Sequence, residues 1–103
     1  MQEVLDSCFR RNDIFRGSLY RFADQLRGSG MSMSNNIAEG SGSSSKREFK
    51  QYLNTARRSS FESANILILL RRRELIREEY LERLLDKLDH LCRQITNFQG
   101  SLL

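Results

Sequence analysis

Apolar residues near the C-terminal end of the chain recur with the spacing of an amphipathic helix. The intervals alternate between three and four residues, which is the spacing of the a and d positions in a coiled-coil seam. The residues of this series are Leu81, Leu84, Leu88, Leu91, Ile95 and Phe98. The series predicts a helix that begins near Arg77 and ends by Gly100, which we expect to occupy the C′ position after the helix.

A second series predicts a long helix in the middle of the chain. Ser45 stands three residues before Glu48, which is the spacing of a capping box at a helix start. The apolar and small residues that continue the stripe are Phe49, Tyr52, Leu53, Ala56, Ser60, Ser63, Leu67 and Leu70. We expect a helix from Ser45 to Glu74, roughly 43 Å long at a rise of about 1.5 Å per residue.

A third series lies upstream and ends at a glycine. Its members are Phe15, Leu19, Phe22, Leu26, Ser29, Met33 and Ile37. We expect Gly40 to cap this helix and residues 40–44 to connect it to the Ser45 cap, so that the two helices form an antiparallel hairpin.

Small residues near the middle of this hairpin predict a close approach of its helices. Antiparallel pairing about the corner places Gly28, Ser29, Gly30 and Ser32 roughly opposite Ala56, Ser59 and Ser60. Small side chains on both helices allow the two backbones to approach. Each helical glycine costs about 1 kcal/mol relative to alanine, and a kink at these glycines is the competing interpretation.

Length and composition favour a single helical domain. The chain has 103 residues, enough for one core. It contains no proline and is rich in leucine, arginine and glutamate, which favour helices. We predict an all-α fold, an antiparallel helical bundle over residues 14–103, preceded by a short helix or arm at residues 1–13.

Few side chains are suited to catalysis or metal binding. His90 is the single histidine, and its neighbours Asp89 and Cys92 point in different directions around the predicted helix, whereas a metal site needs three or four converging ligands. The Gly/Ser tract before Lys46 lacks the spacing of a phosphate-binding loop. We therefore predict no catalytic residue, no metal site and no cofactor, and a protein that is not an enzyme.

Cysteine spacing and the length of apolar runs indicate the compartment in which we expect the protein. Cys8 and Cys92 form no C-x-x-C pair, and two isolated cysteines suit a reducing compartment. The longest apolar run, residues 64–70, is too short to span a bilayer. We expect a cytoplasmic protein with no membrane partner.

Positive charge is concentrated on the predicted middle helix. Between Lys46 and Arg73 there are eight basic residues against Glu48 and Glu62, while residues 74–89 are net acidic. The candidate nucleic-acid-binding residues are Lys46, Arg47, Lys50, Arg57, Arg58, Arg71, Arg72 and Arg73. Such a helix faces a polyanion such as RNA, or it pairs with the acidic helix of its own chain or of a neighbour. We see no aromatic residue interleaved with the basic stripe, which predicts low sequence specificity.

Several short segments of the chain resemble one known family. They are QLR at Gln25 to Arg27, SMSNNIAEG at Ser32 to Gly40, SKREF at Ser45 to Phe49, YLNTA at Tyr52 to Ala56 and SSFE at Ser59 to Glu62. Together they resemble the bacterial 23S rRNA intervening-sequence proteins, over roughly residues 19–76 of this chain.

The resemblance implies a four-helix-bundle fold, of which this chain has a short or missing first helix. It also implies a homo-oligomer, a pentamer in the family, that associates with ribosomal or other structured RNA without catalysis. A related branch consists of accessory proteins of diversity-generating retroelements, which implies a reverse transcriptase as protein partner. Two functions remain open: an RNA-binding homo-oligomer, and a protein-interaction module whose basic helix meets an acidic protein.

The residues that the resemblance marks as structural are Asn36, Glu39, Gly40 and Glu62. We expect Gly40 to adopt the left-handed conformation of a helix cap. Asn36 and Glu39 are expected to supply hydrogen bonds or an ion pair to the neighbouring helix, through Arg57 or Lys46. The corner is therefore interpreted as architecture and not as a ligand site.

Overall fold

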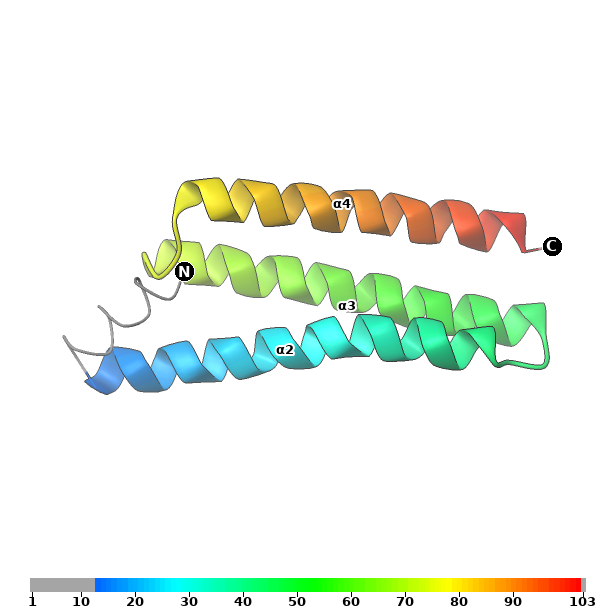
Figure 1. The fold of residues 1–103 in the computed structure, drawn as a ribbon, viewed down its shortest axis with the longest axis horizontal. Helices are drawn as coiled ribbons and strands as arrows, with labels where there is room; N and C mark the ends of the chain where they lie inside the picture. The colour runs from blue at the N-terminus through cyan, green and yellow to red at the C-terminus, as the bar shows by residue number, and fades with distance from the viewer. Residues whose placement is uncertain (1–12, 103) are drawn as a thin grey trace.

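The structure is a computed structural model that describes residues 13–102. Over these residues the chain forms three helices and no strand: α2 (Asp13–Ser41), α3 (Lys46–Arg72) and α4 (Glu78–Ser101). Successive helices are antiparallel, and α3 lies between α2 and α4 and packs against both (Figure 1). The prediction of an all-α fold is confirmed.

The four-helix-bundle prediction goes beyond what these three helices establish. Helix α2 already begins at Asp13, and residues 1–12, which carry the predicted N-terminal arm, lie outside the described residues. A short first helix, and a domain boundary after residue 13, therefore stay predictions.

Helix α3 begins at the predicted cap. Ser45 is extended, with φ −133° and ψ 149°, and its Oγ accepts a hydrogen bond of 3.1 Å from the backbone N–H of Glu48. This bond satisfies one of the N–H groups that a helix start leaves without a partner. The Glu48 carboxylate in the first turn also suits the positive end of the helix dipole.

The end of α3 differs from the prediction by two residues. The helix stops at Arg72 because Glu74 adopts a left-handed conformation with φ 58°. The Glu74 N–H donates to the Arg71 carbonyl and the Leu75 N–H donates to the Leu70 carbonyl, each at 2.9 Å. These two bonds form a Schellman motif, and the buried Leu75 side chain supplies the apolar contact that accompanies it.

The predicted role of Gly40 as a left-handed cap is wrong. Helix α2 continues through Gly40 to Ser41, and no glycine among residues 13–102 has a positive φ. Gly40 is buried instead, because the first turns of α3 pass directly over it at Tyr52 and Phe49. Gly100 is likewise helical, and the cap of α4 falls at Leu102.

The small-residue contact between α2 and α3 is confirmed for the serines. Ser32 Oγ lies 2.8 Å from Ser59 Oγ, and the buried Ser29 Oγ lies 2.6 Å from Ser63 Oγ. Ser29 therefore meets a residue farther from the corner than Ala56, its expected neighbour. Side chains of a helix lean toward its N-terminal end, and in two antiparallel helices these directions are opposite. Residues whose side chains meet are therefore offset along the helix axis from residues whose backbones lie directly opposite each other.

The glycines on either side of Ser29 do not mediate this contact. A Cβ atom added at Gly28 or at Gly30 would meet nothing within 4 Å. The expectation that these two glycines allow the close approach is wrong, because Gly28 is exposed and Gly30 borders an open groove between α2 and α4.

Apolar residues are buried in two clusters toward opposite ends of α3. The cluster far from the corner contains Leu19, Ile66, Leu67, Leu70, Leu75, Ile76 and Leu81, and the one near it contains Leu53, Ala56 and Ile95. Buried Ser59, Ser60 and Ser63 occupy the stretch of α3 between them. At the corner end, the Phe49 and Phe98 rings meet edge to face at 5.4 Å and tie α4 to α3. Within residues 13–102, no helix has the length and apolar character that crossing a membrane requires.

Candidate nucleic-acid interface

The basic residues of α3 fall into three groups along the helix and do not form one continuous stripe. Lys46, Arg47 and Lys50 stand at its start, and Arg57 and Arg58 stand near its middle. Arg71, Arg72 and Arg73 stand at its end. At about 1.5 Å per residue, roughly 20 Å of helix separates Arg58 from the last group.

Two residues of the last group, Arg71 and Arg73, make contacts within the chain. Arg71 Nε donates to Glu78 Oε2 at 2.8 Å, and its Nη1 donates to the Ile76 carbonyl at 3.2 Å. The guanidinium of Arg73 lies over the Phe22 ring, 5.3 Å from its centroid. These contacts fasten the turn between α3 and α4, so Arg71 and Arg73 have roles inside the chain.

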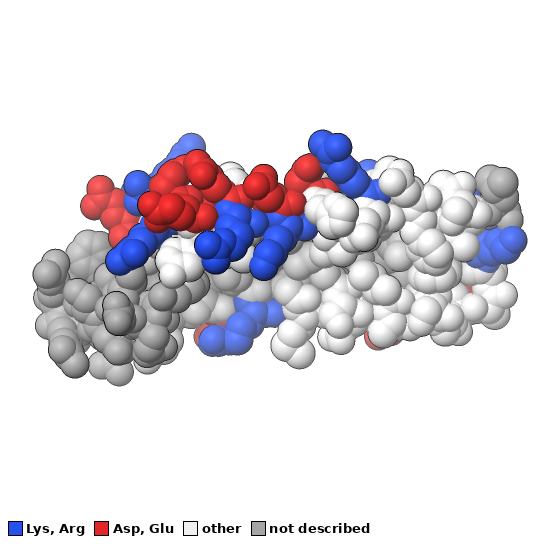
Figure 2. Space-filling model, turned by 45° about the horizontal axis from the view of Figure 1, so that its top comes forward, with Lys and Arg blue, Asp and Glu red and all other residues white. Residues whose placement is uncertain are grey.

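Acidic residues of α4 neutralise little of the remaining charge on α3. Acidic and basic side chains are interleaved over one half of the face in Figure 2, and the other half carries few charges. Among residues 13–102, Arg71–Glu78 is the one ion pair that joins α3 to α4, and Asp89 pairs with Arg93 of its own helix. Charge pairing among the described residues therefore accounts for Arg71 and gives the first two groups no ion pair within residues 13–102.

Among the residues of the corner motif, the Asn36 side chain forms hydrogen bonds within its own helix. Asn36 Nδ2 donates to the Ser32 carbonyl at 2.7 Å and to Ser32 Oγ at 3.1 Å. Glu39 and Glu62 are exposed, and neither forms an ion pair with another residue in the described part of the chain. The expected link from Asn36 or Glu39 to the neighbouring helix is not formed.

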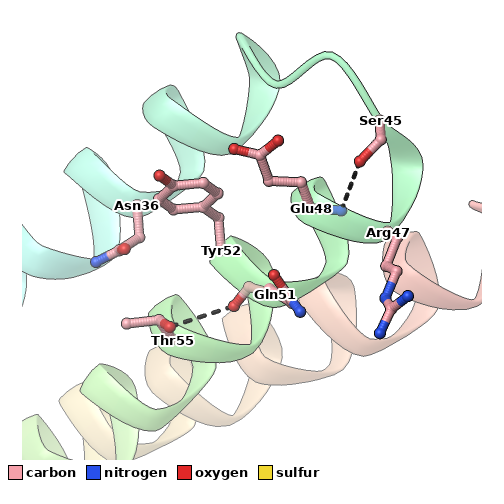
Figure 3. Close-up of a pocket in the computed structure, with 7 residues that line it drawn as sticks. All are labelled: Asn36, Ser45, Arg47, Glu48, Gln51, Tyr52 and Thr55. Carbon is pink, nitrogen blue, oxygen red and sulfur yellow. Dashed lines mark hydrogen bonds between the residues drawn. The ribbon is translucent and has the colours of Figure 1, made fainter.

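An open cleft of about 480 Å³ lies beside the corner (Figure 3). It is lined by Asn36, Ser45, Arg47, Glu48, Gln51, Tyr52 and Thr55. In Figure 3 the Tyr52 ring stands between Asn36 and Glu48, and Arg47 lies beyond Glu48 and points away from them. One exposed arginine beside one exposed glutamate gives no concentrated charge, and the Ser45 hydroxyl already accepts the Glu48 N–H. We therefore keep the structural interpretation of the corner.

A second groove, between α3 and α4, was missed by the sequence reasoning. It has a volume of about 430 Å³ and is lined by Arg57, Phe61, Cys92, Arg93, Thr96 and Asn97. We call it the arginine groove. The prediction of a basic stripe without an interleaved aromatic residue is wrong, because Phe61 follows Arg57 by one turn of α3 and is 64% exposed. The i, i+4 spacing of Arg57 and Phe61 was the available signal.

A third groove, of about 290 Å³, opens between α2 and α4. Its apolar lining comes from Leu26, Met33, Leu67, Leu84, Leu88 and Leu91. We call it the apolar groove. Its walls come from the two outer helices and its floor from α3, and residues 13–102 supply no fourth helix to cover it.

Side chains for metal binding do not converge in this structure. The residues that the structure describes contain no group of three histidine, cysteine, aspartate or glutamate side chains that could hold a metal ion. Cys92 instead contacts the Ser60 hydroxyl across the α3–α4 interface.

Together these features define a helical protein with a basic central helix and an apolar groove between its outer helices. The family model of the 23S rRNA-intervening sequence proteins matches residues 4–97. The chain therefore belongs to this family. Neither a curated protein nor a solved structure gives a significant match.

Proposed function

We propose that this protein is a non-catalytic, self-associating helical protein that binds structured RNA through the first two basic groups of α3. The residues that carry this role are Lys46, Arg47, Lys50, Arg57 and Arg58. In this proposal Arg72, exposed at the end of α3, adds a peripheral contact, while Arg71 and Arg73 serve the fold.

The observation that carries the proposal is that these five residues form no ion pair within residues 13–102. Guanidinium and ammonium groups left without an internal partner are available to phosphates, and arginine forks match phosphate oxygens well. Each phosphate neutralised releases counterions, which adds about 0.9 to the slope of log affinity against log salt for duplex DNA and less for single strands.

Self-association is supported by the apolar groove. Of the leucines that line it, Leu67 is buried, and the others are only partly buried and so expose apolar surface to solvent. An uncovered apolar surface favours association with a complementary one. A second copy of the chain is the occupant that we propose, and the subunit number is to be measured by sedimentation.

The test is a titration of the protein with a structured 23S rRNA fragment at low and at near-physiological salt. The variant Arg57→Glu/Arg58→Glu should lose the salt-dependent binding, because it reverses two charges at the centre of α3. A matched control is Arg77→Glu/Arg83→Glu, which makes the same change of net charge among the exposed residues of the α4 region. The control should bind RNA nearly as well as the wild type.

Oligomer size is measured on the same samples. An RNA-binding role predicts that Arg57→Glu/Arg58→Glu keeps the wild-type size while it loses RNA. Absence of wild-type binding even at low salt would contradict the proposal.

A second candidate is a protein-interaction module in which the same basic residues meet an acidic partner, including a reverse-transcriptase-type protein. The observation that favours it is the position of the apolar groove, which would hold a helix of a partner. It predicts no RNA binding by the wild type and loss of the partner in Arg57→Glu/Arg58→Glu.

A further inference from the structure

We propose that the arginine groove holds one unpaired nucleotide of the bound RNA, with its phosphate at Arg57 and Arg93 and its base against the Phe61 ring. This inference rests on the proposed function, since it assumes that the protein binds RNA. It goes further by assigning a pocket, a class of ligand and a preference for single-stranded segments.

Arg57 supplies the first argument. Its Nε is buried and has no hydrogen-bond partner among the residues that the structure describes. A buried donor without an acceptor is costly. No hydrogen bond among the described residues holds the Nε of this side chain in place, and Arg57 is one of the residues that line the groove. Arginine pairs most strongly with planar or tetrahedral oxyanions, which points to a phosphate as the group that completes this site.

Arg93 supplies a second cation from the opposite wall. Its Nε donates to Asp89 Oδ2 at 3.1 Å, and both side chains are largely exposed, at 76% and 63%. Exposed pairs of this kind contribute little, so a phosphate can compete for the guanidinium. Arg57 and Arg93 come from different helices and flank the same groove, which suits one anion held between them.

Phe61 supplies the surface for a base. Its side chain is 64% exposed, which is unusual for a large apolar ring, and it lies one turn along α3 from Arg57. Bases of single strands stack on such rings regardless of sequence, whereas the bases of a duplex are already stacked and paired. The hydroxyl of Thr96 and the amide of Asn97 line the same groove and can hydrogen-bond to a base edge.

The lining of the arginine groove is mostly apolar in area but includes the polar groups of four residues, and this combination suits a nucleotide, which has an apolar base face and a charged phosphate. Two arginines, a threonine and an asparagine surround one ring and one thiol. A protein partner that used Phe61 as an apolar anchor would leave these polar groups to be desolvated without matched acceptors.

The experiment compares two RNA ligands that carry the same number of phosphates, a single-stranded oligonucleotide and a blunt duplex. Wild type, Phe61→Ala and Phe61→Leu are titrated with both. Because Phe61 is exposed, neither substitution removes a core contact. We expect both variants to bind the single strand about tenfold more weakly than wild type and the duplex within about twofold. Met31→Ala, at a residue with 63% exposure on α2, is the matched control and should change neither affinity.

Several results would overturn the inference and leave the proposed function standing. One is an unchanged single-strand affinity in Phe61→Ala while Arg57→Glu/Arg58→Glu still weakens binding. Another is wild-type affinity in Phe61→Leu, which keeps the apolar surface but lacks the ring. A third is a change of oligomer size in Phe61→Ala, which would make Phe61 an interface residue. Absence of binding to either RNA by the wild type would overturn both proposals.

Discussion

Gly40 packs against Tyr52 so closely that a Cβ atom on Gly40 would lie 2.7 Å from the Cβ of Tyr52. The Phe49 ring stands at 2.8 Å from the same position. Both neighbours belong to the first two turns of α3, so the corner between α2 and α3 is a tightly packed joint. Its geometry depends on the absence of a side chain at Gly40 and not on a left-handed backbone.

Gly40→Ala should therefore destabilise the protein. The added methyl meets a Cβ atom that cannot move without its helix, and overpacking of this kind costs about 1–3 kcal/mol. The gain in helix propensity, about 1 kcal/mol, reduces the expected net loss to at most about 2 kcal/mol. Urea denaturation at a fixed protein concentration measures the free energy of unfolding, which depends on concentration if the protein self-associates.

Gly28→Ala is the control for Gly40→Ala. Gly28 is exposed in the interior of α2, and a Cβ atom there meets nothing within 4 Å. This substitution should raise the free energy of unfolding by up to about 1 kcal/mol. Equal effects of the two substitutions would contradict the packing described at the corner.

Glu74→Gly should stabilise the turn between α3 and α4. Glu74 holds φ 58°, a conformation that costs a residue with a Cβ atom about 1–2 kcal/mol and costs glycine little. We expect a gain of about 1 kcal/mol in the free energy of unfolding. The control is Glu74→Ala, which keeps the Cβ atom and should leave the free energy of unfolding nearly unchanged. If the glycine variant were no more stable than the alanine variant, the left-handed cap at Glu74 would be contradicted.

The buried serine pair between α2 and α3 should show strong coupling. Ser29 Oγ lies 3.1 Å from the Leu26 carbonyl and 2.6 Å from Ser63 Oγ. These distances fit a chain in which Ser63 donates to Ser29 and Ser29 donates to the carbonyl. Ser29→Ala leaves the buried Ser63 hydroxyl without its acceptor, which costs about 1–3 kcal/mol.

A double-mutant cycle tests this chain of hydrogen bonds. Ser29→Ala/Ser63→Ala removes both partners, so its loss should be smaller than the sum of the two single losses. Additive losses, measured by the same denaturation experiment, would show that the two hydroxyls do not depend on each other.

Met33→Glu should weaken self-association through the apolar groove. Met33 lines this groove and is half-buried, so a carboxylate there places a charge in the surface that we propose a second copy covers. Sedimentation should show smaller species, with helix content unchanged. Met31→Glu is the matched control, since Met31 is 63% exposed and lies outside the groove lining. Identical sedimentation of both variants and the wild type would place the interface elsewhere.

The sequence alone determined the helices and most of their ends. The period of apolar residues predicts α4 within one or two residues of Glu78–Ser101, and the spacing of Ser45 and Glu48 predicts the start of α3. These signals are local: a cap and a hydrophobic stripe depend on residues a few positions apart. The family is also recognisable from short segments of the chain, in agreement with the match over residues 4–97.

Tertiary structure alone decided which small residues matter and which charges have partners. The sequence predicts a left-handed cap at Gly40 and a close helix contact at Gly28, yet of these two glycines it is Gly40 that lies beneath another helix. Arg71 and Arg58 are both basic residues of α3, yet only Arg71 reaches a carboxylate, on Glu78. The arginine groove joins Arg57 to residues more than thirty positions away on α4. Such relationships depend on the register and rotation of the packed helices. The period of an apolar stripe does not specify them, because the stripe of one helix can pack against the next helix at several displacements along the axis.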